Sequence, residues 1–479
     1  MTRLALIASA ILLSPAAMAQ TPPAEHDHSE HAPAPVAAPQ TPAADEHAGH
    51  VATPPTEDKK PMDHGAMDHS TMDHTKMGHA GMDHSGMKDD AGGHQMSGAF
   101  GAYPMTRDGS GTSWVPDEAT HGGLHANAGD WMLMGHANLD LVYTDQQGPR
   151  GDSKALAAGM FMGTARRDFG GDTLQFRAMV SPDPLMGKRG YPLLLAAGET
   201  ADGLDTLVDR QHPHDLFMEL SASYSMKVSE KDSVFVYGGL PGEPAFGPPA
   251  FMHRPAAAGS PEAPITHHWM DSTHITFGVV TAGWVHDNWK IEASRFRGRE
   301  PDEKRYDIET GELDSTSVRA TWNPTINWSL QASWADVTSP EQLEPDVNMT
   351  KYSISALYTR KLANDGEISF TGAYARKDSS EGGALDGWLA EAAWKPDADW
   401  TVFSRAEAIE TDELGAVHHG PVEDVSRIGV GVVRDFRVGA NTTLGLGVLV
   451  NRNMVSDALS PSYDGDPWGG MAFVRLKIG

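Results

Sequence analysis

Short segments in which polar and apolar residues alternate run through most of the chain, and they restrict its possible folds more than any other feature. Between Asn327 and Trp334 every second residue is apolar, and the residues between them are Asn, Ser or Gln. The segments that contain Tyr352 and Ile368 repeat this period of two. Such a period places successive side chains on opposite faces of a β-strand. The pattern therefore predicts an all-β body.

About sixteen segments of this kind can be counted along the chain, with an uncertainty of about two to four. They begin near Trp131, Leu156, Thr173, Phe217, Ser233, Thr273, Trp289, Thr316, Asn327, Tyr352, Ile368, Trp388, Thr401, Arg427, Leu444 and Gly470. After the first twenty residues, no apolar stretch approaches the roughly 18 residues of a transmembrane helix. If the protein enters a membrane, we expect it to do so as a barrel.

Tryptophan pairs bracket several short connections between the predicted strands. These pairs are Trp284 and Trp289, Trp322 and Trp328, and Trp394 and Trp400. Aromatic residues at the short-turn side are typical of the membrane interface of transmembrane barrels. Longer polar connections at residues 297–313, 336–350 and 409–425 resemble the extracellular loops of such barrels. We therefore predict an antiparallel outer-membrane β-barrel of about 14–16 strands, with a soluble β-sandwich or propeller as the alternative.

Residues 1–19 have the features of a secretory signal peptide. Arg3 supplies a positive charge, Leu4 to Leu13 an apolar core, and Ala17 to Ala19 a cleavage site with small residues.

The chain has no cysteine, so an exported form has neither disulfides nor thiolate metal sites, and a metal would be bound by His, Met or carboxylates. With 37 basic and 65 acidic residues, the net charge is −28, which disfavours nucleic acid as a partner and favours cations.

Residues 20–98 differ in composition from the rest, and they contain a repeat in which methionine recurs every five residues with histidine two places later. The candidate metal ligands in this arm are Met62, His64, Met67, His69, Met72, His74, Met77, His79, Met82, His84, Met87 and His94. A period of five fits neither a helix nor a strand, and large apolar residues are scarce, so we expect disorder. Thioether sulfur selects Cu(I) and imidazole suits Cu(II), so the repeat predicts copper binding. A polar tail of biased composition is the alternative.

Four of the repeats read Met-Asp-His, and they begin at Met62, Met67, Met72 and Met82. Together with a β-rich body of barrel type, this exported repeat resembles the copper resistance protein B family of bacterial outer membranes. The resemblance covers the repeat and the architecture. It implies an outer-membrane protein that sequesters copper or helps to move it across that membrane.

The body of the chain has candidate ligands of its own. In the first long predicted strand, Met132, Met134 and His136 alternate with apolar residues and are expected to face the lumen. The next strand carries Met160 and Met162 on one face. A hairpin in register would therefore line one wall with four thioethers and an imidazole, a set suited to copper. Methionines that fill irregular gaps between lumen side chains are the alternative.

Histidines gather at other places in the body, most densely in the run Asp209–Asp215. His212 and His214 of this run are predicted metal ligands, although the run could instead cap a pore or fix a loop by salt bridges. The other histidines of the body are either metal ligands or solvated loop residues. They are His121, His125, His253, His267, His268, His274, His418 and His419. Leu240 to His253 is too rich in proline for a central strand and is predicted to be a long loop, folded inward as a constriction or exposed.

These features predict four parts: a signal peptide (1–19), a disordered metal-binding arm (20–98), a lead-in segment (99–129) and a barrel (130–479).

The predicted function is copper tolerance through sequestration of copper, with transport through the barrel. The predicted location is the outer membrane, with the arm in the periplasm. Expected partners are copper ions, outer-membrane lipid and periplasmic copper proteins. Common hydrolase, P-loop and zinc-protease signatures are absent, so we predict no enzyme. The alternatives are a general porin or small-solute channel with a metal-buffering tail, and a soluble periplasmic metal-binding β-protein.

Overall fold

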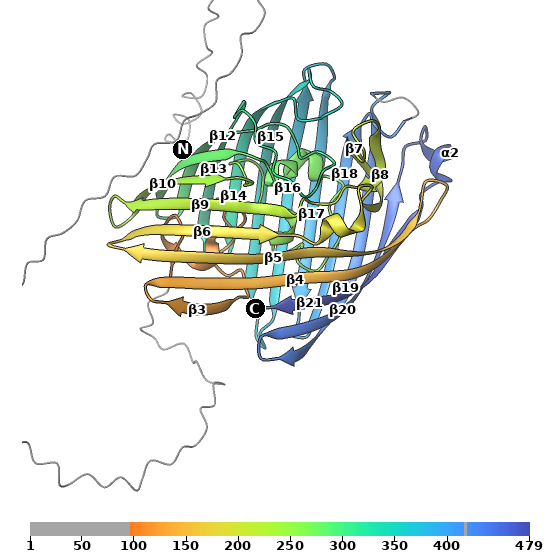
Figure 1. Ribbon diagram of the computed structural model, residues 1–479. Coiled ribbons are helices and arrows are strands. Elements are labelled where there is room, and N and C mark those ends of the chain that lie inside the picture. Colours follow the sequence, from red (N-terminus) through yellow and green to blue (C-terminus); the bar gives the residue numbers. More distant parts are fainter. Residues whose placement is uncertain (1–95, 416–418) are drawn as a thin grey trace, which may run out of the picture. The chain divides into compact units, whose positions relative to one another are not determined.

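The computed structural model describes residues 96–415 and 419–479, without the side chain of Glu199. The predicted signal peptide and nearly all of the predicted arm lie outside these ranges. The described chain forms a closed antiparallel barrel of sixteen strands (Figure 1), which confirms the predicted fold class. The strands are β4 (Trp131–Gln146), β5 (Ser153–Phe169), β6 (Asp172–Val180), β9 (Phe217–Lys227), β10 (Asp232–Gly239), β11 (Val279–His286), β12 (Trp289–Phe296), β13 (Ser315–Thr325), β14 (Trp328–Thr338), β15 (Asn348–Lys361), β16 (Glu367–Ser379), β17 (Ala384–Lys395), β18 (Trp400–Thr411), β19 (Glu423–Gly439), β20 (Thr442–Met454) and β21 (Trp468–Ile478).

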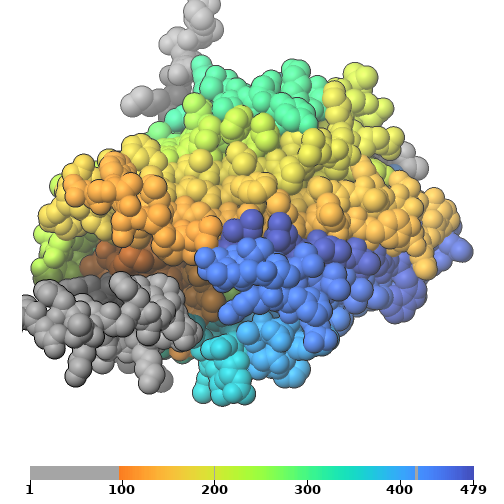
Figure 2. All heavy atoms as spheres, turned by 60° about the horizontal axis from the view of Figure 1, so that its bottom comes forward, coloured from red at the N-terminus to blue at the C-terminus, as the bar shows by residue number. Residues whose placement is uncertain are grey.

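The barrel closes where the last strand, β21, pairs with the first long strand, β4. Figure 2 shows these strands side by side on one face, in blue and orange. The short strand β3 (Leu124–Ala128) pairs with the beginning of β4, which extends beyond the partner strand β21. Because every barrel strand has two neighbours, the sheet has no open edge along its length.

Smaller elements precede the barrel or lie in its connections. They are β1 (Ser97–Gly98), β2 (Gly101–Pro104), η2 (Met105–Arg107), η3 (Asp183–Met186), β7 (Tyr191–Thr200), β8 (Thr206–Gln211), η4 (Phe251–His253), α1 (His267–Met270), η5 (Ser272–His274) and α2 (Ser460–Tyr463). One predicted strand start was wrong: the strand expected near Thr273 begins at Val279. Thr273 lies in η5, and the apolar residues Ile275 and Phe277 that follow it are buried inside the barrel.

The outer face of the barrel is apolar, and its exposed side chains include Leu446, Val448 and Val450 of β20. The predicted tryptophan pairs bracket the short turns between β11 and β12, β13 and β14, and β17 and β18. An apolar band with aromatic residues near the turns is the surface of a transmembrane barrel. None of the helices in the described ranges has the length and hydrophobicity needed to cross a membrane.

The lumen is filled by two segments of the chain, residues 96–122 and residues 240–277, which we call the N-terminal insert and the inward loop. Most residues of the inward loop are buried, which confirms that the Pro-rich stretch is a loop and shows that it folds inward. The lumen face of the strands carries many polar and charged side chains. Many of them form ion pairs and hydrogen bonds with the two inserted segments, because buried polar groups need partners.

Ion pairs between buried groups hold the inward loop against the barrel wall. Arg254 lies between Asp271 of the same loop and Glu391 of β17, at 2.8 Å from each carboxylate. Glu262 pairs with Arg427 of β19 at 2.7 Å. These contacts determine which side chains of the loop face the remaining cavities.

Candidate metal-binding lumen

The hairpin of β4 and β5 places the predicted methionine ligands on the lumen wall. His136 lies opposite Met162, and Asn138 lies opposite Met160. Met132 and Met134 occupy the same face of β4, since side chains two residues apart share a face. The hairpin is therefore in the register that the sequence pattern required, and all five predicted ligands line one cavity.

This cavity, which we call the methionine chamber, has a volume of about 330 Å³. Its thioethers and imidazoles come from β4, β5, the inward loop and the segment before β4: Met105, Met132, Met134, Met160, Met162, Met252, His121, His125, His136 and His253. Lys477 and Gly479 also line it, so the chamber lies toward the end of the barrel that carries the short turns.

Two imidazoles in the chamber have a buried nitrogen without a hydrogen-bond partner among the described residues. These atoms are Nδ1 of His136 and Nε2 of His253. Burial, with a smaller contribution from the neighbouring His136, lowers the pKa of His253 to about 3. A neutral imidazole with an unused nitrogen is the form that binds a metal ion.

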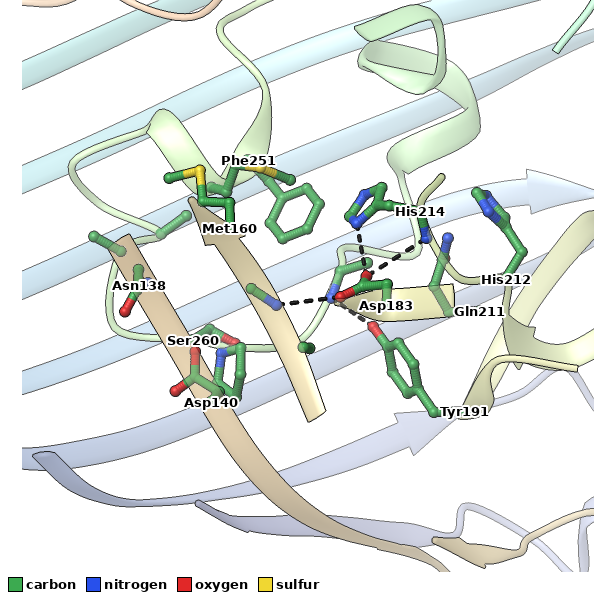
Figure 3. Close-up of a pocket in the computed structure, with 17 residues that line it drawn as sticks. Asn138, Asp140, Met160, Asp183, Tyr191, Gln211, His212, His214, Phe251 and Ser260 are labelled. Carbon is green, nitrogen blue, oxygen red and sulfur yellow. Dashed lines mark hydrogen bonds and ion pairs between the residues drawn. The ribbon is translucent and has the colours of Figure 1, made fainter. Parts of the chain in front are cut away.

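A second, smaller cavity of about 60 Å³ adjoins the methionine chamber, and Met160 and Met252 line both. Figure 3 shows this cavity, with Asp183 hydrogen-bonded to His214 and Met160 facing the same space. Met160 also belongs to a buried cluster with Met179 of β6 and Met218 of β9. Met160 and Met252 are therefore the thioether groups that border both the chamber and the smaller cavity, which His212 and His214 also line.

The two predicted ligands His212 and His214 lie beside three histidines of the inward loop. The ring centroids of His214 and His274 are 5.2 Å apart, and those of His274 and His267 are 5.1 Å apart. His212 lies 6.1 Å from His267 and 6.0 Å from His268. We call these five residues the histidine cluster. The sequence pattern did not predict this grouping, because the histidines belong to two segments that are separated in the chain.

The run Asp209–Asp215 also fixes loops by salt bridges, as one interpretation of the sequence had suggested. Asp209 pairs with Arg150 at 2.5 Å, and Asp215 pairs with Arg305 at 3.2 Å. Arg210 contacts Asp152 at 2.9 Å. These ion pairs join the β7–β8 hairpin and the segment after it to neighbouring loops, and they place His212 and His214 at the lumen.

The arm ligands from Met62 to His94 lie outside the described residues, so copper binding by the arm stays a prediction. Within the described ranges, one group of three carboxylate or imidazole ligand atoms lies within 4.8 Å of one another, and it consists of Asp302, Asp307 and Glu309. This group lies in the loop between β12 and β13, away from the methionine chamber.

Comparison with known proteins gives no family for the chain. No family model and no curated protein matches it. Among solved structures, OmpF of Salmonella typhi in complex with daunomycin is 11% identical with a TM-score of 0.46, over 74% of this chain and 100% of that chain. An anion-selective porin from Comamonas acidovorans is 12% identical with a TM-score of 0.42, over 73% of this chain and 99% of that chain. The functional interpretation therefore depends on the residues of this chain.

Proposed function

We propose that the protein is an outer-membrane copper-binding barrel whose methionine chamber binds Cu(I). The observation that carries this proposal is the concentration of thioether and imidazole groups around one cavity of about 330 Å³ in a chain without cysteine. Soft thioether ligands favour Cu(I) over the harder divalent ions. The unpartnered nitrogens of His136 and His253 supply further ligand atoms in the same cavity.

The Met/His arm has a supporting role in this proposal. Its repeats offer many weak copper sites on one chain, and linked sites hold a ligand more strongly than the same sites apart. Short turns of outer-membrane barrels face the periplasm, and the methionine chamber lies toward that end. A periplasmic arm would therefore concentrate copper near the chamber, which fits the resemblance to the copper resistance protein B family.

The test measures Cu(I) binding by an arm-silenced chain, which we define as the full-length protein with each Met of residues 62–87 changed to Leu and each His of residues 20–98 changed to Asn. In detergent and under reducing conditions, this chain should still bind Cu(I) tightly. Changing Met132, Met134, Met160 and Met162 to Leu should abolish this binding, because leucine keeps the volume and removes the sulfur.

A matched control changes four methionines outside the chamber to leucine: Met226, Met349, Met454 and Met471. The control chain should bind Cu(I) as the arm-silenced chain does. Unchanged Cu(I) binding after loss of the four chamber methionines would contradict the proposal. It would indicate that these methionines only fill gaps between lumen side chains.

A small-solute channel is the second candidate, favoured by the closed sixteen-strand barrel and its charged lumen. Conduction in this case would require the inward loop to leave the lumen, because its buried residues occupy that space. Rapid uptake of sugars by proteoliposomes containing the unaltered chain would favour this candidate. Slow uptake with retained Cu(I) binding would favour the copper-binding barrel.

A further inference from the structure

We propose that the histidine cluster is a second metal site, separate from the methionine chamber, and that it binds a divalent transition-metal ion such as Cu(II) through imidazole nitrogens. His214, His267 and His274 are the ligands that the geometry supports most directly. The inference goes beyond the proposed Cu(I) binding and stands without it, because different residues carry it.

Each of the three imidazole rings is oriented by a hydrogen bond at its Nδ1 atom. Nδ1 of His214 lies 2.8 Å from a carboxylate oxygen of Asp183, and Nδ1 of His267 lies 2.8 Å from a carboxylate oxygen of Asp271. Nδ1 of His274 lies 2.6 Å from the backbone carbonyl oxygen of Asp271 and therefore donates to it. Metal-binding histidines commonly donate one ring nitrogen to a carboxylate or carbonyl and bind the metal with the other.

His274 also has a ring nitrogen that is available as a metal ligand. Nε2 of His274 is buried and has no hydrogen-bond partner within the described part of the chain, and the residue is only 7% exposed. The hydrogen bonds of the His214 and His267 rings also use Nδ1 alone. A buried polar atom without a partner costs free energy, which a bound metal ion would offset.

The surrounding residues hold these ligands in place. Asp271 accepts from His267 with one carboxylate oxygen and from Arg254 with the other, at 2.8 Å in both cases. Arg254 is in turn bound to Glu391 of the barrel wall. His267 and Asp271 are one helical turn apart in and just after α1, so the local fold also favours their contact.

The chemistry of the cluster differs from that of the methionine chamber. Its five imidazoles are nitrogen ligands, which suit Cu(II), Zn(II) and Ni(II), whereas thioethers select Cu(I). Among the described residues, no three imidazoles of the cluster have ligand nitrogens that all lie within 4.8 Å of one another. Metal binding therefore requires the rings to turn so that their nitrogens approach one another. This movement is small, because the centroids of neighbouring rings are 5.1 and 5.2 Å apart.

The experiment titrates Cu(II) into the arm-silenced full-length chain and records its electron paramagnetic resonance spectrum. We expect a tightly bound Cu(II) whose superhyperfine pattern shows several imidazole nitrogens. The double change His267→Gln and His274→Gln should remove this signal. Asp183→Asn should keep the fold, because the asparagine oxygen can still accept from the Gly159 backbone amide. It should weaken Cu(II) binding by about 10- to 100-fold, because the Asp183 carboxylate orients His214.

The control is His286→Gln, since His286 lies at the short turn between β11 and β12 and bonds Asp232 outside the cluster. This control and the four-methionine chamber variant should both keep the Cu(II) signal. Unchanged Cu(II) binding in the His267/His274 variant would overturn this inference, and it would leave the proposed binding of Cu(I) by the methionine chamber intact. A spectrum of the arm-silenced chain without imidazole nitrogens would overturn it without any lumen variant.

Discussion

The position of each chamber methionine depends on the pairing register of two strands. His136 faces Met162 across the β4–β5 hairpin, and Met134 faces Thr164. A slip of one residue would turn the side chains of the slipped strand to the opposite face of the sheet. The apolar residues of β4 stabilise the observed register, since Leu133 and Leu141 are exposed on the outer face, where lipid would cover them.

At the residue scale, the loop between β14 and β15 should show a pH-dependent stability that originates at Glu341. Burial and then the neighbouring Glu413 raise the pKa of Glu341 to about 7, from 4.5 in the unfolded chain. The folded loop therefore binds more protons than the unfolded loop between these two values, so its stability falls as the pH rises through this window. Hydrogen exchange of residues 339–347, corrected for intrinsic rates, should show less protection at about pH 8 than at about pH 5.

Glu341→Gln should remove most of this difference, because glutamine does not titrate. Glu312→Gln is the matched control, since Glu312 is exposed in the neighbouring loop between β12 and β13. Greater protection of wild type at high pH than at low pH would contradict the assignment. Retention of the full pH dependence by Glu341→Gln would assign it to other groups.

The sequence was sufficient to predict which face of a strand a residue occupies, but not which residues the loops bring together. The period of two fixed the lumen face of Met132, Met134 and His136 before any contact was known. His267 and His274 were visible as histidines, but their approach to His214 depends on how the inward loop folds within the barrel. No local period reports such a contact, because irregular segments do not repeat their side-chain directions.

At the scale of elements, the inward loop is the part that separates this barrel from an open channel. Arg254 is fully buried and bridges Asp271 and Glu391. Removing one partner of a buried ion pair leaves the other charge uncompensated and costs about 3–5 kcal/mol. Arg254→Met should therefore loosen the inward loop and raise the single-channel conductance in planar bilayers.

The control for this experiment is Arg295→Met, which removes an exposed arginine of β12 that bonds Thr316 and the Leu313 carbonyl. Its conductance should equal that of the wild type. If Arg254→Met also conducted like the wild type, the ion pairs of Arg254 would not be what retains the loop. The sequence predicted a loop here from its proline content but left its direction open, since proline density excludes a central strand without specifying what covers the loop.

At the scale of the whole molecule, the effect of an arginine on the outer surface should depend on its depth in the membrane. Val448 lies near the middle of β20 and Val438 near the short turn after β19, and they are 51% and 60% exposed. Arginine on the lipid face costs about 2–4 kcal/mol at the bilayer midplane and about 0–1 kcal/mol near the interface. Val448→Arg should therefore lower the free energy of unfolding in lipid vesicles far more than Val438→Arg. Equal, small losses would contradict a lipid-facing surface.

Strand alternation, short turns flanked by tryptophan and long polar loops together predicted the barrel and its strand number, because each is a local pattern. The filled lumen was not predicted, since it results from contacts between segments far apart in the chain. Lys290 of β12 donates to the carbonyl of Thr112, and Arg319 of β13 reaches both the Thr112 hydroxyl and the carbonyl of Gly247. Charged residues on a polar strand face look the same in a sequence whether water or another segment satisfies them.

We propose that the lumen of this barrel binds copper through methionine sulfur. X-ray absorption of the arm-silenced full-length chain, loaded with Cu(I) in detergent and washed, identifies the atoms around the bound copper. We predict retained copper with a coordination shell dominated by sulfur, and loss of that shell when Met132, Met134, Met160 and Met162 are changed to leucine. A chain that retains no copper after washing, or whose copper has only nitrogen and oxygen neighbours, would contradict the claim.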